Sequence, residues 1–393
     1  MNNFDTIIER RGSGCYKYDI CDDKDVLPLW VADMDFEAAP AIKRAIMKRA
    51  EHGVFGYAKV PDEYYEAVIN WFSRRHAWNI RREWIEYTIG VVPAMSCIIK
   101  AVAVPGDKIL MTSPVYNCFY SSIKNCGCMA EESKLIQGDD GKYHIDWTDF
   151  EERCKDESVV AFILCNPHNP GGRVWRKDEL ERICDICSRN NVLVISDEIH
   201  NELVMPGYTY TPFASISQQA LDNSVTCISA SKSFNIAGLQ IANIVCSNPA
   251  LKRRINRIIN IHEVCDVNPF GIVATIAAYN ESEEWVDDLM KYIQGNYRLV
   301  IQRIKEEGNE LMHCMPLEGT YLAWIDCTPL LTKLSITSQQ FEDLLIKEAK
   351  VFFNAGSMYG AGGEQFIRIN MACPRTTLNE ALNRLFRFIK SKA

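Results

Sequence analysis

Three short apolar runs in the middle of the chain predict strands that are buried on both faces. They cover residues 159–164, 192–195 and 225–228, and each is made of β-branched and other apolar side chains. Amphipathic stretches typical of helices lie between the runs, among them 177–189. Strands that alternate with helices in this way predict a mostly parallel central sheet flanked by helices, an α/β fold.

The pattern changes toward both ends of the chain. The first forty or so residues contain Pro28 and Pro40 and few periodic stretches, so we expect an irregular arm. After residue 283 a long charged helical pattern leads into a smaller unit with strands at 319–325 and 366–371. We therefore expect three parts: residues 1–45 as an arm that packs with the small domain, 46–282 as the large domain, and 283–393 as a smaller α+β domain.

Polar residues follow each of the three central strands at the point where the strand ends. Lys232 follows 225–228, Asp197 follows 192–195, and Asn169 follows 159–164. If the strands are parallel neighbours, these side chains converge on one carboxyl-terminal edge, where open α/β sheets bind ligands. Each residue alone has an ordinary interpretation, since a lysine is normally a solvated surface charge and an aspartate often caps a helix. Their shared position favours a site.

The residue types indicate a particular cofactor. An aldehyde that stabilises a carbanion needs a desolvated amine for its Schiff base, and Lys232 supplies one. A pyridine ring also needs a carboxylate opposite its nitrogen to stay protonated, and Asp197 suits that role because a buried lone carboxylate needs a cation. The sequence thus predicts pyridoxal phosphate held covalently by Lys232.

The phosphate group of the cofactor is expected to bind at the start of a helix. Residues 86–95 indicate a strand, a turn at Gly90, and a helix with Pro93 in its first turn. Free amides and the helix dipole attract anions at such a start. We expect the amides of Val91 and Val92, with the hydroxyls of Ser229 and Ser231, to hold the phosphate.

Seven motifs in order along the chain resemble those of a known family. They are residues 29–36 (LWVADMDF), 55–57 (FGY), 113–116 (SPVY), 166–175 (NPHNPGGRVW), 197–200 (DEIH), 229–239 (SASKSFNIAGL) and 366–374 (FIRINMACP). With them the chain resembles fold-type I pyridoxal phosphate enzymes of the aminotransferase superfamily. It resembles most the MalY/PatB group of cystathionine β-lyases and cysteine-S-conjugate β-lyases, almost from end to end.

The resemblance implies a role for each matching position. Asn169 would hydrogen-bond the ring hydroxyl and Tyr116 would stack on the ring face, beside Lys232 and Asp197. Arg368 would receive the substrate α-carboxylate through two parallel hydrogen bonds, for which a guanidinium has the right shape. Its other interpretation is a surface charge, but burial in the alternating strand 366–371 without an anion would be costly.

Three further positions carry implications of the resemblance. Tyr57 matches a tyrosine that reaches the phosphate of the neighbouring subunit, which implies a homodimer with shared sites. Where many aminotransferases have a tyrosine three residues after the pyridine aspartate and an arginine eight residues after the lysine, this chain has His200 and Gln240. Both changes resemble the lyase group. His200 either contacts the ring oxygen or braces Asp197, and the sequence leaves both open.

Composition and charge indicate which partners and which cellular compartment to expect. The 393 residues are 47% hydrophobic, enough for a large core, and the net charge of −8 argues against nucleic acid as the main partner. The first twelve residues are polar and charged, unlike a signal peptide, and no apolar run is long enough to span a membrane. Sixteen scattered cysteines in so large a chain favour a reduced, cytoplasmic protein. We interpret the pairs Cys184/Cys187 and Cys126/Cys128 as ordinary packing, with no metal site expected.

The predicted reaction starts with a sulfur amino acid taking the place of Lys232 on the cofactor. The freed lysine removes the Cα proton and a thiolate leaves from Cβ, giving pyruvate and ammonia after hydrolysis. For L-cystathionine the thiol is homocysteine. The alternative is a class I/II aminotransferase, which forms the same carbanion but reprotonates it on the cofactor carbon. A cofactor-bound regulatory protein is a third, less favoured interpretation.

Overall fold

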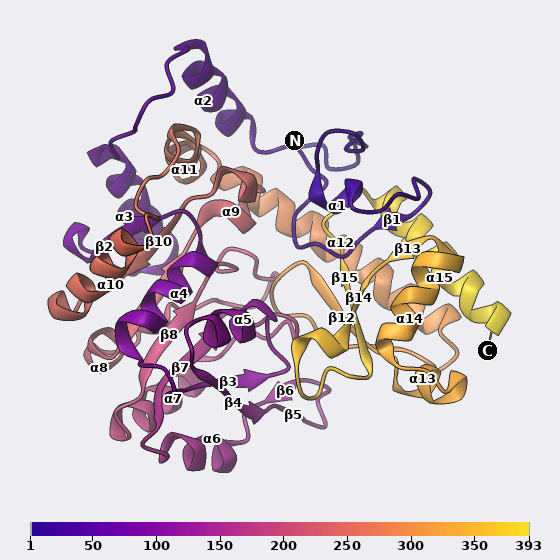
Figure 1. Cartoon of the computed structure of the whole chain (residues 1–393). Helices are drawn as coiled ribbons and strands as arrows, with labels where there is room; N and C mark the ends of the chain where they lie inside the picture. Colours follow the sequence, from indigo (N-terminus) through magenta and orange to yellow (C-terminus); the bar gives the residue numbers. More distant parts are fainter. Residues whose placement is uncertain (1, 393) are drawn as a thin grey trace.

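A seven-stranded sheet forms the core of the larger part of the protein in the computed structural model, which describes residues 2–392 (Figure 1). The strand order is β2-β10-β9-β8-β7-β3-β4, and only β10 runs against the other six. The strands are β2 (Ile85–Thr88), β3 (Lys108–Ser113), β4 (Met129–Lys134), β7 (Val159–Cys165), β8 (Leu193–Asp197), β9 (Ser224–Ile228) and β10 (Ala242–Val245). The expected neighbours β7, β8 and β9 are adjacent and parallel, as their sequences predicted.

Helices cover both faces of this sheet because alternate strand residues point to opposite sides. Ile109 and Ile163 pack with α4 (Val91–Val102), α5 (Cys118–Asn125) and α10 (Pro249–Ile261). Phe162 and Val194 pack with α6 (Trp147–Cys154), α7 (Lys177–Arg189) and α8 (Gln218–Asp222) on the other face. Two buried faces explain why the strands are apolar throughout. The other α-helices between residues 40 and 282 are α2 (Pro40–Glu51), α3 (Asp62–His76), α9 (Ala230–Ser233) and α11 (Pro269–Glu281).

A second, antiparallel sheet of four strands follows the long helix α12 (Glu283–Glu307). Its order is β11-β12-β15-β14. The elements are β11 (His313–Cys314), β12 (Leu322–Asp326), β14 (Asn354–Ala355) and β15 (Phe366–Asn370), with α13 (Thr328–Leu334), α14 (Ser338–Leu344) and α15 (Arg375–Lys392) beside them. The antiparallel pair β5 (Ile136–Gln137) and β6 (Tyr143–His144) stands apart from both sheets.

The amino-terminal arm lies against this second sheet (Figure 1). Before α2 begins at Pro40, it contains one short helix, α1 (Tyr16–Asp19), and one short strand, β1 (Leu27–Pro28), which pairs in parallel with β13 (Val351–Phe352). Farther along, the amide of Asp35 donates to the carbonyl of Ala372 at 2.8 Å. The boundaries at residues 45 and 282 stay a prediction.

The strand expected at 319–325 begins later than its sequence suggested. Gly319 forms an isolated antiparallel bridge with Val204, and Thr320 has a φ of +71°, which breaks the extended run before β12 starts at Leu322. Helices α7 and α12 span the ranges that their patterns predicted. None of the helices within residues 2–392 combines the length and the apolar character needed to cross a membrane.

Candidate active site

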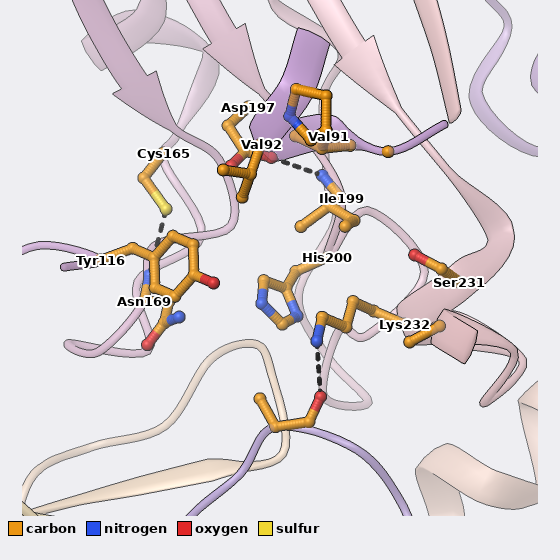
Figure 2. A pocket seen from close by; sticks show the side chains of 14 residues that line it. Val91, Val92, Tyr116, Cys165, Asn169, Asp197, Ile199, His200, Ser231 and Lys232 are labelled. Atoms are coloured by element: carbon orange, nitrogen blue, oxygen red, sulfur yellow. Dashed lines mark hydrogen bonds between the residues drawn. The ribbon is translucent and has the colours of Figure 1, made fainter. Parts of the chain in front are cut away.

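A cavity of about 210 Å³ opens at the carboxyl ends of β7, β8 and β9 and at the start of α4 (Figure 2). The convergence expected from the sequence is therefore confirmed. Eight of the predicted site residues line the cavity: Val91, Val92, Tyr116, Asn169, Asp197, His200, Ser231 and Lys232. Lys232 is the one lysine or arginine among the lining residues.

Lys232 lies in α9, directly after β9, and its amine points into the cavity (Figure 2). Its Nζ donates a hydrogen bond of 2.6 Å to the carbonyl oxygen of Ala32. Desolvation lowers the pKa of the Lys232 amine, and the nearby charge of Asp33 partly opposes this shift. A depressed pKa gives the amine the unprotonated form that a nucleophile or general base requires.

Asp197 is the last residue of β8, and its side chain is 4% exposed. Its Oδ1 accepts a hydrogen bond from the amide of Ile199 at 3.1 Å. Among residues 2–392 no lysine, arginine or histidine forms a salt bridge with it, and desolvation raises its pKa to about 7. A buried carboxylate in this position is ready to pair with a cationic ring nitrogen.

The first turn of α4 forms another wall of the cavity through Gly90, Val91 and Val92. The amides of a first helical turn lack acceptors within the helix and carry the positive end of its dipole. Ser231 and Ala237 line the cavity with this turn. Gln240 is exposed, so no arginine faces this end from its position. The groups available here to an anion are the amides of this turn and the hydroxyl of Ser231.

Arg368 lies on β15 of the second sheet, and its side chain is 3% exposed. It donates to Asn169 Oδ1 at 3.1 Å and to the carbonyl of Trp30 at 2.8 Å, while its Nε has no partner. The Tyr359 ring lies 4.9 Å from the guanidinium carbon. No carboxylate pairs with Arg368 within the described residues, so the site contains a buried cation that an incoming carboxylate would neutralise.

His200 is buried, and its Nδ1 has no hydrogen-bond partner within the described residues. Burial lowers the pKa of His200 to about 3, helped by the positive charges of Lys232 and Arg368. The ring is therefore neutral at physiological pH. In this structure no hydrogen bond joins His200 to Asp197, and its role stays a prediction.

Three other predicted residues differ in their placement. Tyr116 lines the cavity, and its ring meets that of Phe119 edge to face at 5.7 Å. Ser229 caps α9 and does not line the cavity, since its hydroxyl accepts from the amide of Ser231 and donates to the carbonyl of Ile241. Tyr57 is 98% exposed, between α2 and α3, so it does not reach the cavity of its own chain.

The segment 29–36, which we call the strap, takes part in the site although no role is predicted for it from its residue types. Its carbonyls accept hydrogen bonds from the second sheet and from the segment around α9: Trp30 from Asn354 at 3.0 Å, Asp33 from Asn370 at 2.6 Å, Phe36 from Asn235 at 2.7 Å, and Ala32 from Tyr321 at 2.8 Å as well as from Lys232. Asp33 and Asp35 form buried or half-buried salt bridges with Arg10 and Lys17. The strap thus closes the cavity over the lysine. Its motif was visible in the sequence, but backbone carbonyls leave no side-chain signal.

These groups match the parts of a phosphorylated pyridine aldehyde. The amine of Lys232 suits the aldehyde, the unpaired carboxylate of Asp197 suits the ring nitrogen, and the start of α4 suits the phosphate. Among the residues that the structure describes, no three His, Cys, Asp or Glu side chains gather as a metal site would require.

The fold and the site define a fold-type I pyridoxal phosphate enzyme. The chain belongs to the aminotransferase class I and II family, whose model matches residues 24–385. It is 36% identical to cystathionine beta-lyase PatB of Bacillus subtilis over 98% of both chains, and 31% identical to protein MalY of Escherichia coli over the full length of both. The structure of cystalysin from Treponema denticola, which contains pyridoxal 5'-phosphate, matches with a TM-score of 0.95 and 36% identity over 100% of this chain and 99% of that one.

Proposed function

We propose that this protein is a pyridoxal phosphate-dependent carbon–sulfur β-lyase. It cleaves L-cystathionine or a related cysteine S-conjugate to a thiol, pyruvate and ammonia. The observation that carries the proposal is the arrangement of three groups around one cavity. Lys232 and Asp197 line it, and the unpaired guanidinium of Arg368 contacts Asn169 on its wall. The full-length similarity to a cystathionine beta-lyase favours lyase chemistry within this family.

Arg368, Asp197 and Lys232 each have a separate role in the proposed reaction. Arg368 binds the substrate α-carboxylate, with its orientation set by Asn169 and by the Trp30 carbonyl. Asp197 stays negatively charged once a cation faces it and so keeps the ring nitrogen protonated. When bound, pyridoxal phosphate supplies an electron sink for the negative charge that forms at the substrate Cα. Lys232, with its lowered pKa, takes the Cα proton, and the thiolate departs from Cβ.

The strap gives this chemistry a dry environment. It covers Lys232 from the side of the second sheet, and its carbonyls are already hydrogen-bonded. Exclusion of water strengthens the electrostatic interactions inside the cavity and protects a reactive carbanion from unwanted protonation. The arm 1–45 and the unit 283–393 carry the strap and Arg368 together, and we propose that they close as one body on the large domain 46–282.

We propose that the working form is a homodimer with shared sites. Tyr57 is 98% exposed, and its neighbours Val54 and Phe55 are 63% and 57% exposed, so this apolar segment stays largely uncovered although the Phe55 ring meets that of Phe270 at 5.6 Å. A second copy that covers it would bring Tyr57 toward the phosphate end of the other cavity. We further propose a cytoplasmic enzyme with a small-molecule substrate and no nucleic-acid or membrane partner, supported by sixteen unpaired cysteines and the net charge of −8.

The test is product analysis. Purified protein loaded with pyridoxal phosphate and given L-cystathionine should release free thiol and pyruvate in equal amounts with no 2-oxo acid present. Strict dependence on an added 2-oxo acid would instead identify an aminotransferase. Bound cofactor without measurable turnover on any sulfur amino acid would favour the regulatory interpretation.

A further inference from the structure

The carbonyl oxygen of Ala32 accepts two hydrogen bonds at the centre of the site. One comes from Lys232 Nζ at 2.6 Å and the other from the hydroxyl of Tyr321 at 2.8 Å. A carbonyl oxygen has two lone pairs, so these donors occupy both of them. A donor on one lone pair draws electron density away from the other. The hydroxyl of Tyr321 therefore weakens the hold of this carbonyl on the Lys232 amine.

Tyr321 is fixed in the position that this effect requires. Its side chain is fully buried, directly before β12, and its own carbonyl accepts from the amide of Met371 at 2.9 Å. The ring meets that of His200 edge to face at 6.1 Å. Asn370 holds the strap next to Ala32 through the carbonyl of Asp33. Neither the hydroxyl nor the carbonyl is free to move independently toward the amine.

We propose that Tyr321 is a positioning residue that sets how readily Lys232 gives up its proton, by sharing the carbonyl of Ala32 with the lysine amine. The inference rests on the proposed function in that Lys232 is taken as the reactive amine. A strong acceptor favours the ammonium form and keeps it at the strap. A shared acceptor favours the neutral amine, which is the form that attacks an aldehyde or removes a Cα proton.

Other titratable groups face the same amine from several elements. They are Asp33 on the strap, Arg368 on β15, Cys118 on α5, Asp197 on β8, and His200 after β8. All of them remain in place when only the hydroxyl of Tyr321 is removed. A change in the titration of Lys232 in such a variant is therefore attributable to the shared carbonyl.

The experiment compares wild type with Tyr321→Phe by two measurements. The first is the pH profile of kcat at saturating L-cystathionine in the loaded enzyme, where the substrate has displaced Lys232 from the cofactor. The second follows, by absorbance, the rate at which cofactor-free protein captures pyridoxal phosphate at each pH, and it needs no turnover. In Tyr321→Phe the acid limb of each pH profile, where the rate falls at low pH, should move to higher pH by about 0.5 unit or more. The reason is that the unshared carbonyl holds the Lys232 ammonium more strongly.

Two further proteins complete the design: a matched control in which no shift is expected, and a variant in which the shift should be to lower pH. Tyr297→Phe removes another half-buried hydroxyl that donates to a carbonyl, that of Met315 at 3.0 Å, away from the cavity, and should leave both limbs unchanged. Site-specific 3-fluorotyrosine at position 321 keeps the ring and strengthens the donor, so both limbs should move to lower pH.

Limbs that stay in place in Tyr321→Phe and in the fluorotyrosine protein would overturn the inference, even if kcat falls. Shifts with reversed signs would overturn it as well. Failure of the wild-type protein to capture the cofactor at Lys232 would refute the proposed function itself. That result is separate, because it is seen before any variant is compared.

Discussion

Arg368 Nη1 lies 3.1 Å from Asn169 Oδ1, and this hydrogen bond joins the second sheet to the edge of the first. The strand β15 and the segment after β7 are thereby connected at the cavity wall. Asn169 also lines the cavity. In the proposed function, one contact would therefore orient both the cofactor ring and the guanidinium that receives the substrate.

The first prediction concerns the shape of the Arg368 cation. Arg368→Lys keeps the charge but loses the fork that contacts Asn169 and Trp30, and it removes the paired donors for a carboxylate. We expect kcat/KM for L-cystathionine to fall about 10- to 100-fold, as the loss of a charge-assisted hydrogen bond would cause. Steady-state kinetics would show this. A decarboxylated S-conjugate serves as the control, since it should be affected little, and an equal loss for both substrates would contradict the assigned role.

The second prediction concerns the pH dependence of stability. In the cofactor-free protein, desolvation raises the pKa of Asp197 from 3.8 to about 7. Between these values the folded state retains a proton that the unfolded state has lost, so stability falls as the pH rises through this window. The carboxylate then costs about 4 kcal/mol above pH 7, as an order of magnitude.

Urea unfolding of cofactor-free Asp197→Asn should therefore show higher stability than wild type at pH 8 and nearly equal stability at pH 4. Addition of pyridoxal phosphate should stabilise wild type more than the variant, because only the carboxylate gains an ionic partner. A variant that is less stable than wild type at pH 8 without cofactor would refute this account of Asp197.

The glycine-rich loop before β15 gives a third prediction. Gly360 has a φ of +90°, and a Cβ added there would lie 1.7 Å from the Tyr120 hydroxyl. The next residue back is Tyr359, whose ring faces Arg368. Gly360→Ala should displace this loop and raise KM more than it lowers kcat.

The control for that variant is Gly207→Ala. Gly207 has a similar φ of +100°, but an added Cβ would meet nothing within 4 Å, so it reproduces the backbone strain without the collision. Equal effects of the two substitutions on KM would show that the loop does not position Arg368.

Much of this site could be predicted from the sequence because side chains and strand order determine it. Lys232, Asp197 and Asn169 follow three strands that were expected to be parallel, and parallel strands end at one edge. The Ala32 carbonyl could not be predicted, since any residue type supplies a carbonyl and only the path of the strap places it. Ser229 was assigned to the phosphate, yet its hydroxyl is engaged within the chain. Position along the sequence does not reveal which of two serines faces the cavity.

The fourth prediction tests sharing of sites between subunits. If Tyr57 serves the partner's cavity, the variants Lys232→Ala and Tyr57→Ala impair different components of the same site. Mixed dimers then contain one site with both residues intact and one with neither. Random mixing in equal amounts should restore about a quarter of wild-type activity, since half of the C2 dimers are mixed and each has one complete site. Activity that never exceeds the average of the two parents would contradict a shared site.

The identity of the covalent anchor is the most direct test of the whole account. The loaded enzyme is reduced with borohydride, digested, and analysed by mass spectrometry for the residue that carries the cofactor. We predict the reduced pyridoxal phosphate adduct on Lys232 alone, and no adduct and no thiol release in Lys232→Ala. An adduct on another lysine, or a Lys232→Ala protein that keeps both the adduct and turnover, would contradict the proposed function.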